Sequence, residues 1–585
     1  MMEIQNPKRR IVEDLKIRNK DNMNLIAGEY FGNRFTYAET FQMFDDYKKA
    51  FLQLDGQNES AVTICAPSTI ASVNAMYGVF DADKIANMIG PGFLFAYPDR
   101  YTRDLGSTTV VIFDSFLNEE FVRRLHDAGV KNVIVTSVTD YMNPLVKKAA
   151  IDRGMVSGID VIDQLSKAGA LPGDMQFIRI PEFAETGAKI KESPVFSYRE
   201  NKIAAYFLTG ATTSVLPKGV KLYADGFTKM AQIYDHVWFD FEPGMRTTVF
   251  IPIFYATSAV HAVHAGLFRG MTLLYKPKYD RFAFATDLLE TKCGICVVAP
   301  SHVAALEGAG LPDNALKHLQ YVSMGGEALL PAQMDKFRKT AKRLGIQYMI
   351  HGYGMTETGS MTGISAQVPD SDSDVTFSPL PGIRYRIVDP ETGKELPQGQ
   401  RGILEMLSPC ATAGYIDSEK DKKLFTKDGW IHTGDVAMQC GEDKYRVFGR
   451  DTDCFTRDGI KYAMFDIEEK VLEHEAVAEA EVVCLNDNDK EAPAIVVVLR
   501  DEYRGKEAEL LKELTKTEAP GMEYLWGIKF IDRFKTNPIT SKRDYLSLKK
   551  EMNGYYVVND DKVYIRKNGI LEECTEVVTV ENTPA

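Results

Sequence analysis

The sequence lacks the features of a membrane, nucleic-acid-binding or secreted protein. No apolar run in its 585 residues approaches the roughly 18 residues that a membrane span needs. The net charge of −13 leaves no surplus of basic residues for contacts with nucleic-acid phosphates. The first residues contain no apolar core of a signal peptide. We therefore expect a cytoplasmic protein with no membrane span and no nucleic-acid partner.

Cysteine is also scarce. Eight cysteines in a chain of this length do not form the framework of a disulfide-rich protein. Cys293 and Cys296 have the spacing of a zinc-binding pair, but the sequence has no second such pair to complete a four-sulfur site. The pair leads into an apolar run, so we expect both cysteines to be buried and structural.

The length and the patterning predict several domains of mixed α/β class. The N-terminal region alternates apolar, strand-like runs with helical patterns, which is typical of layered α/β domains. It predicts strands over residues 60–65, 109–113, 132–136, 202–208, 249–253, 272–275 and 347–350, and a helix over 118–129.

Two changes of pattern suggest domain boundaries. We predict α/β subdomains over residues 1–365 and a small β-barrel or antiparallel sheet over 366–450, which together form an N-terminal domain over 1–450. Residues 451–552 predict a small α+β domain, and the tail over 553–585 contains alternating runs that suggest β-hairpins. Within the small domain we expect helices over 466–474 and 506–516 and strands over 480–485 and 493–499.

The stretch from His351 to Thr358 carries the first chemical signal. Gly352 and Gly354 flank Tyr353, so the backbone can bend there and a flat ligand can lie against the ring. Thr356 and Glu357 follow with two oxygen ligands that suit a hard cation such as Mg²⁺. A second strand-like run upstream ends in Gly325, Gly326 and Glu327. Two such strand ends suit a nucleotide site at the carboxyl edge of a sheet, although ordinary turns have the same composition.

Three further segments offer groups that bind phosphate or ribose. The loop after the predicted strand 202–208 contains hydroxyls, a glycine and a lysine, which suit a phosphate cradle although they do not form a Walker motif. Its candidate ligands are Thr209, Gly210, Thr212, Thr213 and Lys218. Asp435 and Arg450 follow in turn sequences, and a carboxylate such as that of Asp435 can accept both ribose hydroxyls.

The order of these motifs resembles the adenylate-forming superfamily, which contains acyl- and aryl-CoA synthetases, luciferases and adenylation domains of peptide synthetases. The motifs are the Pro-Lys-Gly loop ending at Gly219, Gly-Gly-Glu-Ala from Gly325, Tyr-Gly-Met-Thr-Glu from Tyr353, Asp-Gly-Trp-x-x-Thr-Gly-Asp from Asp428, and Gly-Arg ending at Arg450. The resemblance covers nearly the full length of the chain.

The resemblance implies a two-step reaction. A carboxylate attacks the α-phosphorus of ATP to give an acyl-adenylate and pyrophosphate, and the thiol of CoA then displaces AMP. The residues implied for the nucleotide are the phosphate loop, Gly325, Gly326 and Glu327 beside adenine, Gly352 and Tyr353 against the base, and Asp435 and Arg450 at the ribose. Thr356 is implied at the α-phosphate, Glu357 at Mg²⁺, and Lys542 as the catalytic lysine of a mobile C-terminal domain.

This sequence departs from the family pattern at three positions. Ala211 and Ser214 replace glycines of the phosphate loop, and Thr452 stands at the hinge position. The motif around Lys542 is two residues short and lacks its glycine, so Lys535 is the alternative catalytic lysine. Two alternatives therefore stay open. The protein is an enzyme with reduced turnover, or it binds nucleotide without turning it over.

The sequence indicates only the chemical class of the acid substrate. Tyr255 takes the position of a histidine in the family's aromatic gate, and small apolar residues such as Val260 follow it. No Asp is present there to hold an amino group, so a fatty or aryl acid is favoured over an amino acid. A helix buried in the core has the same small apolar residues, and this is the alternative interpretation of the segment. The acceptor is CoA or, alternatively, the pantetheine of an acyl carrier protein.

Overall fold

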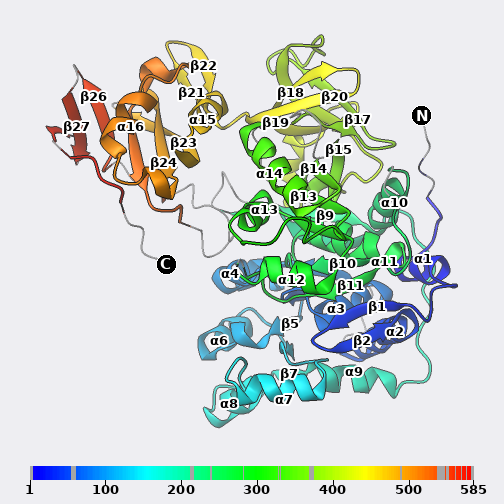
Figure 1. Cartoon of the computed structure of the whole chain (residues 1–585). Coiled ribbons are helices and arrows are strands. Elements are labelled where there is room, and N and C mark those ends of the chain that lie inside the picture. Colours follow the sequence, from blue (N-terminus) through cyan, green and yellow to red (C-terminus); the bar gives the residue numbers. More distant parts are fainter. Residues whose placement is uncertain are drawn as a thin grey trace.

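The computed structural model defines the arrangement of most of the chain. It describes residues 4, 6–54, 61–210, 216–237, 240–280, 282–326, 329, 331–367, 375–487, 490–535, 547–548, 553–559, 562–567, 570–574 and 576–580. Two large sheets and one small sheet form the N-terminal part, and a two-stranded and a six-stranded sheet form the C-terminal part (Figure 1). The fold is therefore of the expected α/β class, with a small α+β region at its end. No helix within these ranges is both long and apolar enough to cross a bilayer.

The first large sheet has seven strands in the order β7-β6-β5-β3-β4-β8-β9. All neighbours are parallel except β8 and β9, which form an antiparallel pair. Its central strands are continuous apolar runs because helices cover both faces. The strands are β3 (Ala61–Cys65), β4 (Ile85–Met88), β5 (Thr109–Phe113), β6 (Asn132–Thr136), β7 (Gln176–Arg179), β8 (Ile203–Leu208) and β9 (Gly219–Tyr223).

The second large sheet has nine strands in the order β16-β15-β14-β13-β12-β10-β11-β1-β2. Its six inner strands, from β14 to β1, are parallel, and the outer pairs are antiparallel. The strands are β1 (Ile26–Tyr30), β2 (Asn33–Thr36), β10 (Arg246–Val249), β11 (Thr272–Tyr275), β12 (Ile295–Val298), β13 (Tyr321–Gly325), β14 (Tyr348–Gly354), β15 (Met361–Gln367) and β16 (Ser378–Pro379).

Helices between the two sheets form the core. Helix α3 (Ile70–Asp81) is buried almost all round, and Thr69 caps its first turn by accepting a hydrogen bond from the Ser72 amide. Tyr77 of this helix stacks on Phe44, with ring centroids 4.4 Å apart. The other helices of the N-terminal part are α1 (Ile11–Arg18), α2 (Tyr37–Leu54), α4 (Pro91–Ala96), α5 (Pro98–Tyr101), α6 (Glu119–Asp127), α7 (Pro144–Asp152), α8 (Val161–Lys167), α9 (Ile180–Ala188), α10 (Ala224–Asp235), α11 (Ala265–Phe268), α12 (Phe284–Thr291), α13 (Pro300–Glu307) and α14 (Pro331–Leu344).

Most of the predicted strands are confirmed, but the one over residues 249–253 is wrong. β10 ends at Val249, and the apolar residues after it form a loop. Pro252 has no amide hydrogen for a ladder, and the Ile251 carbonyl accepts hydrogen bonds from the hydroxyls of Ser68 and Ser258 at 2.7 and 2.6 Å. The helix predicted over 118–129 is α6, with Asn118 as its cap. Cys293 and Cys296 are buried, as expected.

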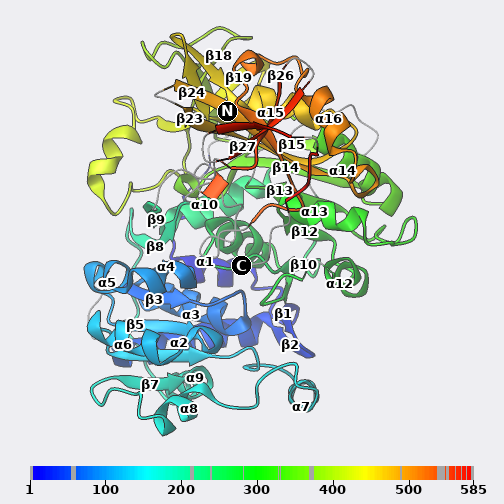
Figure 2. The ribbon, with the colours of Figure 1, turned by 90° about the vertical axis from the view of Figure 1, so that its left-hand side faces the viewer.

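The small sheet of the N-terminal part follows the second large sheet. Four antiparallel strands occupy the region for which a small barrel or sheet was predicted. The strands are β17 (Arg384–Val388), β18 (Arg401–Leu407), β19 (Ile431–Gly441) and β20 (Lys444–Arg450). Phe377 and Tyr445 form an isolated bridge to the neighbouring large sheet. Figure 1 and Figure 2 both show β14 and β15 next to this small sheet.

The C-terminal part contains a six-stranded sheet in the order β23-β24-β25-β26-β27-β28. Ile528 pairs with Tyr556, so the tail strands extend the same sheet. The elements are β21 (Cys454–Arg457), β22 (Ile460–Ala463), α15 (Met464–Leu472), β23 (Val477–Asp487), β24 (Lys490–Leu499), α16 (Glu507–Leu514), β25 (Gly527–Ile531), β26 (Tyr556–Asn559), β27 (Lys562–Lys567) and β28 (Ile570–Glu573).

Helix α15 joins the C-terminal part to the small N-terminal sheet. Arg401 of β18 pairs with Asp466 at 2.7 Å, and Arg446 of β20 pairs with Glu469 at 2.5 Å. The Phe448 and Phe465 rings meet edge to face, with their centroids 6.0 Å apart. These contacts fix the orientation of the C-terminal part in this structure.

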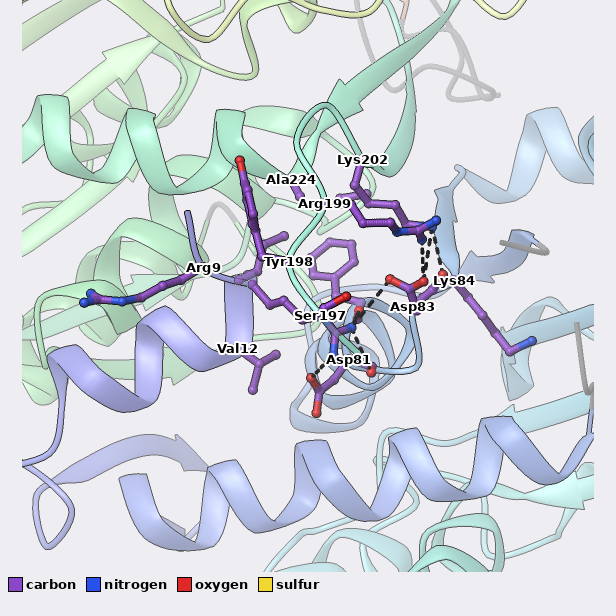
Figure 3. Close-up of a pocket in the computed structure, with 14 residues that line it drawn as sticks. Arg9, Val12, Asp81, Asp83, Lys84, Ser197, Tyr198, Arg199, Lys202 and Ala224 are labelled. Atoms are coloured by element: carbon purple, nitrogen blue, oxygen red, sulfur yellow. Dashed lines mark hydrogen bonds and ion pairs between the residues drawn. The ribbon is translucent and has the colours of Figure 1, made fainter. Parts of the chain in front are cut away.

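A charged cluster fastens the N-terminal segment to the end of α3. The Arg10 guanidinium donates to the Phe80 and Asp81 carbonyls, both at 3.0 Å, and lies 3.3 Å from the Asp81 carboxylate. Arg199 and Lys202 approach Asp83 from the segment before β8 (Figure 3). The cluster encloses about 30 Å³, which is room for about one water molecule. Since its acidic and basic groups face one another, we interpret it as a clasp between segments.

The clasp yields a prediction about stability. Arg10→Ala removes a side chain that is only 13% exposed and takes a donor away from the Asp81 carbonyl, whereas the Phe80 carbonyl keeps its bond from the Asp83 amide. We expect it to lower the free energy of unfolding by about 2–4 kcal/mol, measured by calorimetry of the full chain. Arg103→Ala is the control, because Arg103 and its partner Asp99 lie 2.8 Å apart and are 59% and 52% exposed; its effect should stay below about 1 kcal/mol. Equal effects of the two substitutions would contradict the clasp.

Candidate active site

Two glycine-containing strand ends meet at one edge of the nine-stranded sheet. Gly325 at the end of β13 is the register partner of Gly352 in β14. A side chain on Gly325 would lie 2.8 Å from the Gly352 carbonyl oxygen, and Gly326 has a φ of +89°. The two strands approach closely there because both positions are glycine. Glu327, the third residue predicted at this edge, lies outside the described residues.

β14 ends in a sharp reversal that buries Glu357. The chain passes through a short 3₁₀ turn, η4 (Thr356–Thr358), and returns as the antiparallel strand β15. Glu357 is 5% exposed, and its carbonyl accepts a hydrogen bond from the Thr412 amide at 2.8 Å. Thr356 is half-buried beside it. The turn therefore holds a carboxylate and a hydroxyl at the carboxyl edge of the sheet.

Asp435 joins two of the predicted site residues. It lies in β19 opposite Arg450 of β20, and the Arg450 Nε is 2.9 Å from Asp435 Oδ1. The Tyr353 hydroxyl donates to Asp435 Oδ2 at 2.5 Å. The structure thus brings together Tyr353, Asp435 and Arg450, which stand up to 97 positions apart in the sequence (450 − 353).

Burial shapes the charges of this cluster. Burial raises the pKa of Asp435, while Arg450 and the Tyr353 hydroxyl oppose that shift. Burial and the neighbouring Asp435 also raise the pKa of Tyr353 well above its ordinary value, so its hydroxyl remains a donor. A carboxylate has roughly four acceptor positions, and the protein uses one on each oxygen of Asp435. The remaining positions suit two hydroxyl donors of a ligand.

One face of Tyr353 is already covered. Its ring stacks on Phe377, with centroids 4.7 Å apart and an angle of 14° between the planes. The sequence analysis did not identify Phe377, because its contact with Tyr353 depends on the pairing of β15 with β16. The stack holds the Tyr353 ring in one orientation at the strand end.

The predicted phosphate loop connects the antiparallel strands β8 and β9. The Thr209 amide donates to the Lys218 carbonyl at 2.9 Å, and the Lys218 amide donates to the Thr209 hydroxyl oxygen at 3.0 Å. These bonds close the base of the loop, beside the exposed Gly210. Thr212 and Thr213 lie outside the described residues, as does the predicted catalytic residue Lys542.

Tyr415 links this loop to Glu357, although the sequence analysis did not identify it. The segment before Ile416 runs along β9, and the Lys221 amide donates to the Gly414 carbonyl at 3.0 Å. The Tyr415 hydroxyl donates to Glu357 Oε1 at 2.7 Å, and the Lys218 ammonium lies 4.8 Å from the centre of the Tyr415 ring. The one available sequence signal was a Gly-Tyr pair like that at Gly352 and Tyr353.

The predicted substrate gate lies between the two large sheets. The Ser68 hydroxyl after β3 bonds the Ile251 carbonyl after β10, and Phe254 packs against Gly90. Tyr255 is half-buried, and its ring lies 5.0 Å from that of Phe254. The gate is thus in contact with both sheets.

A π-helix, η3 (Thr257–His264), follows the gate. Val260 on this helix is buried and packs against Gly359, two residues after Glu357. Gly266, which the sequence analysis grouped with the small apolar lining, instead packs against Leu273 of β11. π-Helical turns are frequent at functional sites.

Of two histidines on the π-helix, His264 is buried in the core and His261 is half-buried. Burial lowers the pKa of both His261 and His264 to about 3. Nδ1 of His264 lies 3.0 Å from the Tyr77 hydroxyl, while its Nε2 has no hydrogen-bond partner within the described part of the chain. Both rings are therefore neutral at physiological pH.

Comparisons with known proteins agree with this arrangement. The family model described as AMP-binding enzyme matches residues 15–416. The chain is 25% identical to 4-coumarate–CoA ligase 1 of Petroselinum crispum, over 82% of this chain and 86% of the relative. It is 26% identical to a medium/long-chain-fatty-acid–CoA ligase of Mycobacterium tuberculosis, over 64% of each chain.

A solved structure shares the fold. The crystal structure of the anthranilate CoA ligase AuaEII in complex with anthranoyl-AMP has a TM-score of 0.75 and 17% sequence identity. The match covers 94% of this chain and 98% of that protein. At this level of identity the likeness shows the fold alone.

The buried His264 yields a prediction about pH. An unfolded histidine has a pKa of about 6.5. Between about pH 3 and 6.5 the unfolded chain therefore binds a proton that folded His264 does not bind, and stability falls as the pH is lowered through this range. His264→Gln should lose about 2 kcal/mol less than the natural chain between pH 7 and pH 5, measured by urea unfolding at both values. An unchanged pH dependence would show that His264 is protonated in the fold.

Proposed function

The chain belongs to the AMP-binding enzyme family, and on this premise we propose that it activates a carboxylic acid with ATP and transfers the acyl group to the thiol of CoA. The first step gives an acyl-adenylate and pyrophosphate, and the second gives a thioester and AMP. The observation that carries the proposal is the convergence of separate motifs at one sheet edge. Tyr353, Glu357, Asp435, Arg450 and Lys218 are linked there by direct contacts or through Tyr415.

The free acceptor positions of Asp435 support a nucleotide role. In our proposal they accept the two ribose hydroxyls of ATP, and Arg450 keeps the carboxylate charged and in place. Tyr353 presents its ring to the base, while Gly325, Gly326 and Gly352 let the ligand approach the backbone closely. A bound nucleoside is thus held by groups from two sheets.

The phosphates are proposed to lie between the loop and Glu357. Lys218 supplies positive charge on this side, and Thr209 closes the base of the loop, whose donors Thr212 and Thr213 remain a prediction. Thr356 is proposed to donate to the α-phosphate. These groups would offset the repulsion between the attacking carboxylate and the polyanion, which is the main obstacle in nucleotidyl transfer.

The residues present fit a magnesium ion. Mg²⁺ is commonly held by one or two carboxylates together with substrate phosphates. The buried Glu357 offers one such carboxylate, and within the described residues no three His, Cys, Asp or Glu side chains form a separate metal cage. When bound, the ion would neutralise charge on the phosphates. Glu357 and its hydrogen-bond partners would hold it.

The C-terminal part is proposed to supply the catalytic lysine. Lys542 would contact the acid and the α-phosphate in the first step, with Lys535 as the alternative. Lys535 is exposed after β25. For the second step the C-terminal part would turn about the segment after Arg450 and give CoA access to the adenylate.

The acid is proposed to be aryl or fatty. The gate at Tyr255 and the buried Val260 supply an apolar wall near Glu357. The names of the relatives support these classes, since one is a coumarate–CoA ligase and another a fatty-acid–CoA ligase. The altered phosphate loop favours one competing function, a nucleotide-binding protein without turnover.

Pyrophosphate release tests the proposal directly. The full chain is supplied with ATP, Mg²⁺ and a panel of aryl, fatty and amino acids, each with and without CoA. We expect release with one aryl or fatty acid, and formation of its CoA thioester by mass spectrometry. Release without thioester formation would favour a carrier-protein acceptor. ATP binding without release on any acid would refute the proposal and favour the nucleotide-binding protein.

Asp435→Asn tests the ribose contact. The natural chain should bind ATP about tenfold more tightly than 2′,3′-dideoxy-ATP, and the variant should lose most of this preference because its amide is a weaker acceptor beside Arg450. Affinities are measured by calorimetry without a carboxylic acid. Asp428→Asn is the matched control, since Asp428 also pairs with an arginine, at 2.9 Å, but is 56% exposed; it should keep the preference. A tenfold preference retained in Asp435→Asn would remove Asp435 from the ribose site.

A further inference from the structure

Tyr415 occupies a position between the two groups proposed to control the phosphates of ATP. Its hydroxyl donates to Glu357 Oε1 at 2.7 Å. The Lys218 Nζ lies 3.5 Å from the same hydroxyl oxygen and 4.8 Å from the centre of the ring. One side chain therefore contacts both the candidate magnesium ligand and the lysine of the phosphate loop.

The backbone around Tyr415 is held on both sides. The Ile416 amide donates to the Gly219 carbonyl at 2.7 Å, and the Tyr415 amide donates to the Asp421 carboxylate at 2.7 Å. Gly414 has a φ of +99° and lies against the Asp421 carboxylate, so the turn before Tyr415 suits glycine. Tyr415 itself is 3% exposed. The backbone position of Tyr415 is therefore fixed, and its buried side chain has little freedom to move.

The hydroxyl acts as a donor in this contact. The Glu357 carboxylate offers only acceptors, so the Tyr415 hydroxyl supplies the proton of the 2.7 Å hydrogen bond. A neutral donor fixes the orientation of a carboxylate without cancelling its negative charge. The Lys218 ammonium over the ring is held on the same side by a cation–π contact.

We propose that Tyr415 is a positioning residue that orients Glu357 toward the magnesium ion and holds Lys218 beside the phosphates. The proposal rests on the proposed function, because it assigns a shared partner to two groups of that site. The hydroxyl acts mainly on Glu357 and forms a long contact with Lys218, whereas the ring acts on Lys218 alone.

The hydroxyl contact is tested by Tyr415→Phe, which keeps the ring. ATP affinity is measured by calorimetry on the full chain without a carboxylic acid, once in excess Mg²⁺ and once in EDTA. We expect the gain in affinity due to Mg²⁺ to fall roughly tenfold in the variant, as for the loss of other groups that orient a metal ligand. ATP affinity in EDTA should fall by less than about twofold, because the hydroxyl forms only a long contact with Lys218. Tyr37→Phe is the matched control, since the buried Tyr37 hydroxyl donates to the Met271 carbonyl; it should keep the full gain.

The ring contact is tested by Tyr415→Leu. AMP lacks the β- and γ-phosphates, so the ratio of ATP to AMP affinity in EDTA reports on the groups that face them. We expect Tyr415→Leu to lower this ratio by about threefold to tenfold, and Tyr415→Phe, which removes only the long contact of the hydroxyl with Lys218, to lower it by less than about twofold. AMP affinity in each variant serves as the measure of an intact nucleotide site.

The outcomes separate this proposal from the function on which it rests. An unchanged Mg²⁺ gain in Tyr415→Phe would overturn the positioning role of the hydroxyl. An equal loss of ATP affinity, AMP affinity and Mg²⁺ gain would show that Tyr415 only supports the fold, and would overturn the proposal as well. Failure of the natural chain to bind ATP would instead refute the proposed function.

Discussion

The carboxylate of Asp435 is the interaction on which the candidate site depends. It lies 6% exposed between the nine-stranded sheet and the small sheet, and it receives Tyr353 from one and Arg450 from the other. Arg450 is 45% exposed, but its removal would leave the buried Asp435 carboxylate without its charged partner, which is costly. The three groups therefore constrain one another. They fix how the end of β14 faces the end of β20, and hence the shape of the site proposed for the nucleotide.

Glu357 plays the corresponding part on the phosphate side. Its carboxylate is joined through Tyr415 to Lys218, so β14, the segment beside β9 and the loop after β8 meet at one point. Each of the two buried acids is thus held by a tyrosine hydroxyl that burial keeps protonated. The acids remain available to a ligand because a tyrosine donor, unlike a bound cation, leaves their charge in place. The charges of Asp435 and Glu357 both raise the pKa of Arg450, so the two groups of contacts lie close to each other at this sheet edge.

The sequence predicted the parallel strands better than the loops between them. Strands such as 109–113 and 272–275 are continuous apolar runs because both faces are buried. Residues 249–253 are equally apolar, yet their burial comes from a loop at the sheet edge, which periodicity does not distinguish from a strand. The motifs identified Tyr353, Asp435 and Arg450 singly. The bond between Tyr353 and Asp435, and the roles of Phe377 and Tyr415, depend on pairings between distant segments and have no local signal.

The contacts around Arg450 show which part of the site the rotation proposed for the C-terminal part would leave unchanged. Arg450 ends β20, and its guanidinium is fixed by Asp435 and by the Thr433 carbonyl at 2.9 Å. The Asp451 amide donates to the Gly434 carbonyl, so the chain is anchored up to the first residue of the junction. Beyond it, a rotation must break the ion pairs of Arg401 with Asp466 and of Arg446 with Glu469, as well as the contact between the Phe448 and Phe465 rings. Arg446 and Glu469 are only 23% and 20% exposed, so these contacts are stronger than an exposed surface pair. The same rotation leaves the contacts of Asp435 intact, because Tyr353, Asp435 and Arg450 all precede the junction.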